Sequence, residues 1–570
     1  MIRLNLEKTP FSRRGSHYLI ARRRKADGTT GLFIRTLRAS AHPREIFEIL
    51  VIVDGTPAEF TEEASPEKIT LTAAGGEVQI TMDSADGIRL RSRNVGVRLR
   101  RRRPDDGEYN VDSLFFRDER HLQVNAYRAK EQYMLSLLSG SLQAHAPWEQ
   151  ITCAFIEVDC VPDVNSGIGE LSVEGFESSW KGEARSQPDA FEECARSCGK
   201  LFREWLDATP GVQGLLSETR ILAAYTQYIP LVEPYRLFTR PLMLISPSFN
   251  GIWSWDHCFN AIALSCRQPE LAWEQFIAPF DYQNEDGALP DYANDREAVY
   301  NFTKPPIHGW ALLKLMERMS IGHKALRGFY PRLIKWTEWW FRYRDDNRNG
   351  IPQYNHGNDS GWDNATIFKE AGAVESPDLL SYLALQMEAL SVIAEALDLE
   401  TEAGEWRRRS RELIGRLVSS FWDGNGFVAK RSDTGAVIDS ASLILLMPLL
   451  LGSRLPADIV QKGAAQLRSF LTEWGLATER PDSGLFRERG YWRGPVWAPP
   501  TFMMVDGLRN ASEHELSGEI AARFCALCQK GGMAENFHPF TGEGLGDPAY
   551  TWTASVFLIL AEELMKEPAE

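Results

Sequence analysis

The period of the hydrophobic pattern changes about one third of the way along the chain, and this change limits the possible folds most strongly. In the first part, short apolar runs alternate with polar residues and end at turns such as Asp54-Gly55-Thr56-Pro57. This pattern is typical of antiparallel hairpins. Later, apolar residues such as Phe191 and Cys194 recur every three to four positions, as in helices. We therefore predict a multidomain chain, with an N-terminal antiparallel β-sandwich over residues 1–185 and an all-α domain over residues 186–570.

The second part consists almost entirely of helical patterns. About a dozen follow one another, among them Ser376–Leu397 and Ala441–Leu451, and their lengths are ordinary for helices. Loops rich in Gly, Asn, Asp and Trp separate many of them. Such an arrangement suggests nested helical hairpins that close into a double ring. A ring of this kind gathers its functional loops at one end, so we expect the chemistry in those loops.

Charge and composition exclude several classes of function. The 570 residues carry a net charge of -15, which argues against a nucleic-acid partner because phosphate binding depends on Lys and Arg. The basic run Arg98–Arg103 is interpreted as a salt-bridged or solvated strand end. The N-terminus lacks a signal peptide's apolar core, and no later stretch has the uncharged run of a membrane span. We therefore predict a cytoplasmic protein with no membrane partner.

Tryptophan, glycine and charged residues are concentrated in a few loops, first in Phe249–Asn260 and again in Tyr491–Trp497. A sugar ring has apolar C–H faces that stack on aromatic side chains, and its hydroxyls bind charged groups. These loops therefore predict a carbohydrate site. The alternative for the first loop is structural: Asp256 caps the following helix, and Trp253 and Trp255 belong to the core.

Two further loops combine carboxylates with aromatic residues and glycine. They are Asn358-Asp359-Ser360-Gly361-Trp362-Asp363-Asn364 and Glu535–Gly544. Cleavage of a glycosidic bond requires a protonated acid for the leaving oxygen and a base for water, and two separated carboxylates suit these roles. An Asp in a loop rich in Gly and Asn is also a common turn residue.

Taken in order, these motifs resemble those of the inverting glycosidases of glycoside hydrolase family 63. They are Trp253-Ser254-Trp255-Asp256, Ser360–Asn364, Tyr491–Trp497, Glu535–Gly542 and Trp552-Thr553-Ala554. That family includes oligosaccharide glucosidases and bacterial α-glucosidases, and the mannosylglycerate and glucosylglycerate hydrolases are similar. The resemblance covers about residues 240–565 and implies an (α/α)6 barrel as the catalytic domain. The N-terminal part is similar only in type, as an accessory sandwich.

The resemblance also implies roles for individual residues. Asp363 corresponds to the general acid, Glu535 to the general base and Asp256 to a ligand of the sugar's hydroxyls, while Glu543 is the alternative base. The remaining residues implied in substrate binding are Trp253, Trp255, Trp362, Trp492, Arg493, Gly494, Trp497 and Trp552. The tryptophans would stack on the sugar or line the pocket, and Arg493 would bind a hydroxyl or a carboxylate.

The two catalytic roles require different environments. We expect Trp362 and Phe368 to exclude water from Asp363, which would raise its pKa and keep it protonated. We expect hydrogen-bond donors from Asn536 or His538 to keep Glu535 ionised.

The predicted activity is that of an inverting, α-glucosidase-like glycoside hydrolase that removes a terminal α-linked sugar, glucose, from a short oligosaccharide or glycoside. One alternative is a mannosylglycerate- or glucosylglycerate-type hydrolase. Others are a sugar epimerase, which would use paired histidines, and a non-catalytic carbohydrate-binding protein on the same barrel. The expected partner is a small carbohydrate, and no oligomeric state is predicted.

The predicted reaction requires no cofactor, and no catalytic metal site is predicted. The segment Asp345–Gly350 begins like a calcium loop, with Asp345, Asn347 and Asn349 at alternate positions before glycine. His356 stands where such a loop would place its bidentate glutamate. A turn that closes the preceding helix explains the same residues without metal. Some bacterial members of the similar family hold a structural calcium at a comparable loop, so both interpretations stand.

Overall fold

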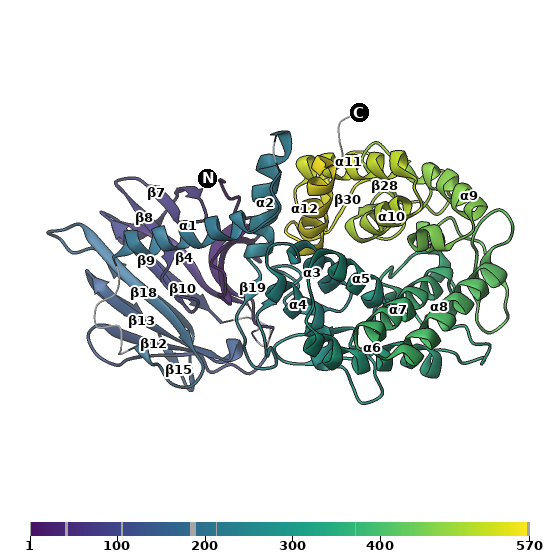
Figure 1. The fold of residues 1–570 in the computed structure, drawn as a ribbon. Helices are drawn as coiled ribbons and strands as arrows, with labels where there is room; N and C mark the ends of the chain where they lie inside the picture. Colours follow the sequence, from purple (N-terminus) through teal and green to yellow (C-terminus); the bar gives the residue numbers. More distant parts are fainter. Residues whose placement is uncertain are drawn as a thin grey trace. The chain divides into compact units, whose positions relative to one another are not determined.

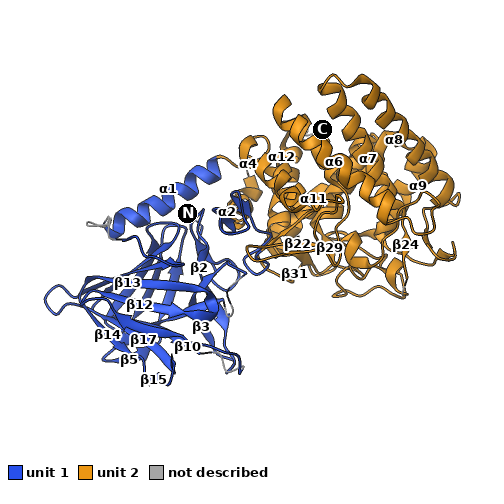
Figure 2. Ribbon diagram, turned by 90° about the horizontal axis from the view of Figure 1, so that it is seen from below, with its two compact units in different colours: residues 1–207, 228–250 blue, residues 208–227, 251–570 orange. Residues whose placement is uncertain are grey.

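The structure is a computed structural model that describes residues 2–39, 41, 44–103, 107–182, 190–212, 214–370 and 372–566. The chain forms two compact units (Figure 2). Unit 1 comprises residues 1–207 and 228–250, and unit 2 comprises residues 208–227 and 251–570. The domain boundary predicted between residues 185 and 186 lies within residues 183–189, outside the described residues.

Unit 1 is built mainly from two large antiparallel sheets (Figure 1). Within the described residues, the first sheet has the strand order β1 (Phe11–Ser12), β2 (Tyr18–Arg24), β3 (Thr30–Thr36), β4 (Glu45–Val53), β10 (Gly96–Arg102), β17 (Phe155–Val161) and β14 (Ser141–His145), with β5 (Thr56–Ala58) on β4. The second has the order β11 (Ser113–Phe116), β12 (His121–Ala126), β13 (Glu131–Ser139), β18 (Ile168–Phe176), β9 (Gly87–Arg93), β8 (Gly76–Met82), β7 (Ile69–Ala73) and β6 (Thr61–Ala64).

Aromatic side chains from both sheets meet in the core of unit 1. The ring centroid of Tyr133 in β13 lies 5.4 Å from that of Phe47 in β4 and 6.1 Å from that of Tyr18 in β2. The Tyr18 hydroxyl donates a hydrogen bond to Glu131 in β13 at 3.1 Å. Burial alternates along strands such as β12 and β17, as the two-residue period predicted. The predicted antiparallel sandwich is confirmed.

Helix α1 (Phe191–Asp207) also belongs to unit 1 and packs on strands of the second sheet (Figure 1). The Cys198 thiol donates to the Met82 carbonyl oxygen at 3.1 Å, and the Arg91 guanidinium lies over the Phe191 ring at 4.2 Å. The helix that the sequence predicts from Phe191 onward therefore covers the sandwich and is not the first helix of the ring.

Unit 2 contains a closed inner ring of helices. In the described part of the unit, each inner helix contacts the next and the last contacts the first, in the order α3 (Asp256–Leu264), α5 (His308–Arg318), α7 (Pro377–Ala396), η7 (Leu443–Arg454), α10 (Ala498–Asn510) and α12 (Thr551–Lys566). Outer helices pack against them (Figure 1): α4 (Pro269–Ile277) on α3, α6 (His323–Tyr343) and α8 (Glu400–Phe421) on α7, α9 (Ala457–Leu467) on η7, and α11 (His514–Gly531) on α10 and α12. The predicted double ring is confirmed.

The inner helices are apolar almost all round because neighbours cover them on every side. All nine residues of α3 are buried. Helix α7 is the one described helix that is long and apolar enough to match a membrane span, and 78% of its most apolar window is buried in the ring. The inner helices thus expose little surface to solvent, and the loops that connect the helices supply the polar groups of the site.

Candidate active site

Two short sheets align the loops that carry the predicted motifs. Strand β29 (Val496–Trp497) pairs with β30 (Asn536–Phe537), which pairs with β31 (Gly544–Leu545). Strand β21 (Ile252–Trp253) pairs with β22 (Tyr292–Ala293). Segments far apart in the sequence are therefore held next to one another, and the carboxylates on them can converge.

Glu535 immediately precedes β30, and only 6% of the residue is exposed. Its carboxylate accepts hydrogen bonds from Tyr491 Oη at 3.1 Å and from the backbone N of Asp547 at 3.3 Å. Burial raises the pKa of Glu535 to about 7, although both donors act to lower it. Tyr491 and Asp547, rather than the expected Asn536 or His538, supply these donors. Burial therefore outweighs hydrogen bonding at this carboxylate.

Because Gly546 has no side chain, the Glu535 carboxylate can lie directly beside its Cα atom. Its φ is +71°, and a Cβ atom at this position would lie 2.1 Å from Glu535 Oε2. The sequence analysis missed Gly546 because turns rich in glycine are common. The available signal was the alternation of Gly542, Gly544 and Gly546 a few residues after the predicted base.

Asp363 follows the short helix η5 (Gly357–Ser360). Gly361 ends η5 with a φ of +74°, and a Cβ atom there would lie 2.7 Å from the Trp255 ring. Glycine therefore allows the second motif to pack directly on the first. Burial raises the pKa of Asp363, and the charge of Lys304 opposes this rise. The shift has the direction that a general acid requires.

Asp256 is the first residue of α3 and is 1% exposed. The N-cap position of α3 is Trp255, and Asp256 lies one position inside the helix, so the capping alternative is wrong. The Tyr550 hydroxyl lies 3.5 Å from Asp256 Oδ1, and Oδ2 has no hydrogen-bond partner among the described residues. Burial raises the pKa of Asp256 well above its usual value. A buried carboxylate with a free acceptor atom is suited to bind a ligand's hydroxyl group.

Tyr491 donates a hydrogen bond to Glu535, and the charges of all three carboxylates act on it. Burial raises its pKa first, and the negative charges of Glu535, Asp363 and Asp256 raise it further. These charges come from three separate loops. Tyr491 has a φ of +63°, which for a residue other than glycine costs about 1–2 kcal/mol. The surrounding contacts therefore hold Tyr491 in an unfavourable backbone conformation beside the carboxylates.

Asn364 joins the loop of Asp363 to the loop of Tyr491. Its side chain donates to the Gly490 carbonyl oxygen at 3.0 Å and accepts from the Trp492 backbone N at 2.9 Å. Its backbone oxygen accepts a hydrogen bond from Arg493 Nε at 2.9 Å. The residue after the predicted acid thus positions the segment that carries Tyr491, which donates to the predicted base.

Lys304 is a buried cation that the sequence analysis missed. Its Nζ lies 2.6 Å from Asp291 Oδ1 and donates to the backbone and side-chain oxygens of Asn358 at 2.9 and 2.6 Å. Its charge acts to lower the pKa of both Asp256 and Asp363, against the larger effect of burial. Lys304 therefore moderates the negative charge of the site without forming an ion pair with either of these carboxylates. No motif in the sequence marked it.

The predicted tryptophans form one packed cluster. The rings of Trp492 and Trp497 stack with centroids 3.9 Å apart, and Trp362 lies 4.8 Å from Trp492. Trp552 lies 5.5 Å from Trp255 and donates its Nε1–H to the Glu535 carbonyl oxygen at 3.1 Å. The exposed fraction of each of these five residues is 4% or less. Their contacts are with one another, with neighbouring aromatic residues such as Tyr491 and Tyr550, and with the backbone of the base loop.

Trp253 and Gly494 differ from this cluster. Trp253 is partly exposed and stacks on Tyr292 with centroids 5.2 Å apart. Gly494 has a φ of +153°, and a Cβ atom there would lie 2.3 Å from the Arg487 carbonyl oxygen. Gly494 therefore allows two backbone segments to approach each other.

The segment considered for calcium forms a network of hydrogen bonds. The Asp345 carboxylate accepts from the backbone N of Asn349 at 3.0 Å and of Gly350 at 2.9 Å. The side-chain amides of Asn347 and Asn349 donate to Glu375 Oε1 at 2.7 and 2.8 Å. These are contacts of an Asx-type turn, and calcium at this loop stays a prediction.

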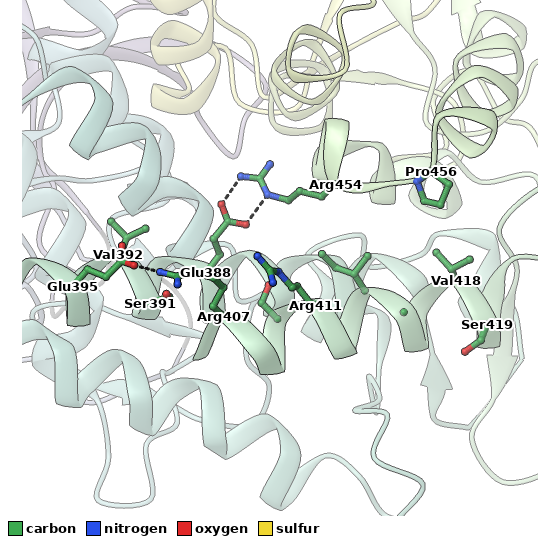
Figure 3. A pocket seen from close by; sticks show the side chains of 13 residues that line it. Glu388, Ser391, Val392, Glu395, Arg407, Arg411, Val418, Ser419, Arg454 and Pro456 are labelled. Carbon is green, nitrogen blue, oxygen red and sulfur yellow. Dashed lines mark hydrogen bonds and ion pairs between the residues drawn. The ribbon is translucent and has the colours of Figure 1, made fainter. Parts of the chain in front are cut away.

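A cavity of about 830 Å³ in unit 2 lies away from these residues, between α7, α8 and the start of the segment after η7 (Figure 3). Arg454 Nε pairs with Glu388 Oε2 at 2.6 Å on one side, and Arg407 pairs with Glu395 on another. None of the predicted site residues lines this cavity. The convergence of carboxylates, and not cavity size, identifies the candidate active site.

Comparison with known proteins gives consistent results. Residues 250–553 match the model of the mannosylglycerate hydrolase MGH1-like glycoside hydrolase domain. A mannosylglycerate hydrolase of Thermus thermophilus is 25% identical over 398 residues, which cover 54% of this chain and 93% of that protein. The glucosylglycerate hydrolase of Mycolicibacterium hassiacum is 23% identical over 435 residues, which cover 59% of this chain and 97% of that protein.

Solved structures support the fold. A family 63 mannosylglycerate hydrolase from Thermus thermophilus, in complex with glucose, matches with a TM-score of 0.52 at 21% identity and covers 60% of this chain and 99% of its own. A bacterial glucoamylase complexed with acarbose matches with a TM-score of 0.63 at 11% identity. The match covers 99% of this chain and 96% of the glucoamylase chain. Unit 2 thus has a glucoamylase-like (α/α)6 barrel fold. Because the family model spans more than half of the 570 residues, the protein belongs to the mannosylglycerate hydrolase MGH1-like glycoside hydrolases.

Proposed function

We propose that this glycoside hydrolase cleaves a sugar from glycerate, in a substrate such as mannosylglycerate or glucosylglycerate, with inversion at the anomeric carbon. This alternative has better support than an α-glucosidase, because the matching family and the similar curated proteins carry these names. The observation that carries the catalytic proposal is a set of contacts that joins the three carboxylate segments. Tyr491 donates to Glu535, Asn364 next to Asp363 bonds the residues on either side of Tyr491, and the Tyr550 hydroxyl lies 3.5 Å from Asp256 Oδ1.

In the proposed reaction, Asp363 donates its proton to the glycosidic oxygen as the bond to the anomeric carbon breaks. Glu535 accepts a proton from the water that attacks this carbon from the opposite face. Inversion needs room for that water, so we expect roughly 6.5–9.5 Å between the two carboxyl groups. Asp256 would bind hydroxyls of the sugar through its free Oδ2.

The environments of the two glutamates support Glu535 as the base. The Glu543 side chain is 55% exposed and pairs with Arg489, whereas Glu535 is buried beside Tyr491. A base must activate one water in a protected site, and an exposed, paired carboxylate does not meet that requirement.

A glycerate leaving group carries a carboxylate, which favours a nearby cation. Lys304 already contacts Asp291 and two oxygens of Asn358. Arg493 is partly exposed and is held through Nε beside Asp363 by the Asn364 oxygen. We therefore assign Arg493 as the ligand of the glycerate carboxylate, since guanidinium groups bind carboxylates through two parallel hydrogen bonds.

Histidine environments weigh against an epimerase. His257 and His308 are buried, and burial lowers their pKa to about 4 and about 3. His356 stacks on Phe302, and His538 Nε2 lies 3.2 Å from Glu488. These residues do not form the exposed pair that reversible proton transfer on a sugar would require.

The test compares mannosylglycerate, glucosylglycerate, maltose and trehalose as substrates, with proton NMR of the first sugar released. We expect cleavage of a glycosylglycerate and initial release of the β-anomer from an α-linked substrate. Initial release of the α-anomer would contradict inversion, and faster cleavage of maltose than of both glycerates would contradict the substrate class. Glucosylglycerol lacks the carboxylate and is the matched control substrate. The variant Arg493→Met should raise KM for glucosylglycerate more than for glucosylglycerol.

A further inference from the structure

A second candidate binding site lies in unit 1, on the first sheet of the sandwich. A cavity of about 590 Å³ opens there next to β2, β3, β4 and β10. Six of its twelve lining residues are Lys or Arg, and three are Asp or Glu. In a chain with a net charge of -15, this is a local excess of positive charge.

Phe33 in β3 is an aromatic platform in this cavity. Gly31 precedes it by two positions and lies on the same face of the strand. A Cβ atom at Gly31 would lie 2.7 Å from Cε2 of the Phe33 ring, so the ring extends across the position of residue 31. The ring is partly exposed. A flat, partly exposed ring is the surface on which the C–H face of a pyranose stacks.

Within the described residues, three of the cations around Phe33 form no ion pair. Lys25 pairs with Glu48 at 3.1 Å, and Arg100 pairs with Glu157 at 2.6 Å. By contrast, no ion pair within the described residues involves three further arginines on this rim, Arg23, Arg24 and Arg102.

Arg35 shows that the positive charge extends below the surface. It pairs with Glu45 at 2.8 Å, but its Nη1 is buried and has no hydrogen-bond partner among the described residues. Burial lowers the pKa of its guanidinium to about 10, and the like charge of Arg23 contributes. A bound anion would relieve this repulsion.

We propose that this cavity binds a small anionic sugar, in which a pyranose stacks on Phe33 and a carboxylate or phosphate group binds Arg23, Arg24 and Arg102. The cavity has the size of a small-molecule site. The net negative charge of the chain disfavours a long polyanion. The family model begins at residue 250, so this inference is independent of the proposed hydrolysis.

The test titrates the full-length protein with D-glucuronate, glucose 6-phosphate and glucose, with binding measured by calorimetry at low and high salt. We expect at least one of the two anionic sugars to bind about tenfold more tightly than glucose. The affinity for that sugar should fall at high salt. Tighter binding of glucuronate would identify a carboxylate site, and tighter binding of glucose 6-phosphate a phosphate site. Equal affinity for glucose and both anions would overturn the proposal.

Variants locate the binding. Arg102→Ser and Phe33→Leu should each weaken binding of the preferred anion about tenfold, whereas Arg196→Ser, at an exposed arginine of α1, should not. Phe33→Leu keeps an apolar side chain of similar size, so circular dichroism should show a folded sandwich. Unchanged affinity in both variants would overturn the site. Binding of an oligothymidylate that Phe33→Leu does not weaken, with no preference for anionic sugars, would show a general polyanion surface instead.

Discussion

Buried charge in the core of the sandwich differs from buried charge at the three candidate carboxylates of the barrel. In unit 1, Arg101 and Asp112 are almost completely buried and pair at 2.7 Å. In unit 2, Asp256, Asp363 and Glu535 form no ion pair among the described residues, and burial raises the pKa of each. A paired buried charge is compatible with a stable fold, whereas an unpaired carboxylate is destabilised and its pKa moves toward neutrality. The comparison separates charge that supports the structure from charge that is available for chemistry.

The largest expected effect is on catalysis. Asp363→Asn and Glu535→Gln should each lower kcat about 10²–10⁴-fold, because each removes a proton-transfer group. Glu543→Gln is the matched control and should retain activity, since Glu543 is exposed and pairs with Arg489. With a glycosyl fluoride, Asp363→Asn should lose less activity because fluoride leaves without protonation, while Glu535→Gln should lose activity on both substrates. A loss in Glu543→Gln as large as in Glu535→Gln would contradict the assignment of the base.

Removing a charge from the sandwich should change stability instead. Arg101→Met leaves Asp112 buried without its partner, so the free energy of unfolding should fall by about 3–5 kcal/mol. The rate per folded molecule should stay unchanged. Urea denaturation and activity assays below the transition provide the measurement, and Arg3→Met, at an exposed arginine, is the control. If Arg101→Met left the free energy of unfolding unchanged, the buried pair would not stabilise unit 1, and the contrast with the unpaired carboxylates of unit 2 would fail.

Removing an unpaired carboxylate should stabilise the barrel. The folded state raises the pKa of Glu535 from 4.5 to about 7. Between these values the folded protein binds more protons than the unfolded chain, so stability falls as the pH rises through this range. Glu535→Gln should therefore increase the free energy of unfolding by roughly 2–4 kcal/mol at pH 8, and by little at pH 4. Denaturation of both proteins at the two pH values tests this, and a destabilised variant at pH 8 would contradict it.

The smallest effect concerns the hydrogen bond to the base. Tyr491→Phe removes a donor to ionised Glu535, so the pKa of Glu535 should rise. The acidic limb of the kcat/KM profile should move up by about 0.5–1 pH unit. Tyr343→Phe, which loses a hydrogen bond to Asp286 outside the candidate site, should leave the limb in place. Movement of the limb to lower pH would show that Tyr491 does not stabilise the ionised base.

Much of the candidate site was recognisable because glycine, tryptophan and carboxylates occur together in short motifs. Gly361 illustrates why: its left-handed backbone and close approach to Trp255 require glycine at that position. Lys304 was not recognisable, since its neighbours Asp291 and Asn358 belong to other loops. The hydrogen bond between Tyr491 and Glu535 likewise depends on the pairing of β29 with β30.

By itself, the sequence determined the two architectures, because the hydrophobic period is a local property of each segment. It did not determine every helix type. The pattern over Ala441–Leu451 predicted an ordinary helix, whereas the structure has the 3-10 helix η7, which contains Pro448 and breaks at Gly452. Only the tertiary structure decided the environment that shifts the pKa of each carboxylate. The pKa of Glu535 depends on burial and on groups from Tyr491 and Asp547, and folding alone brings these groups together.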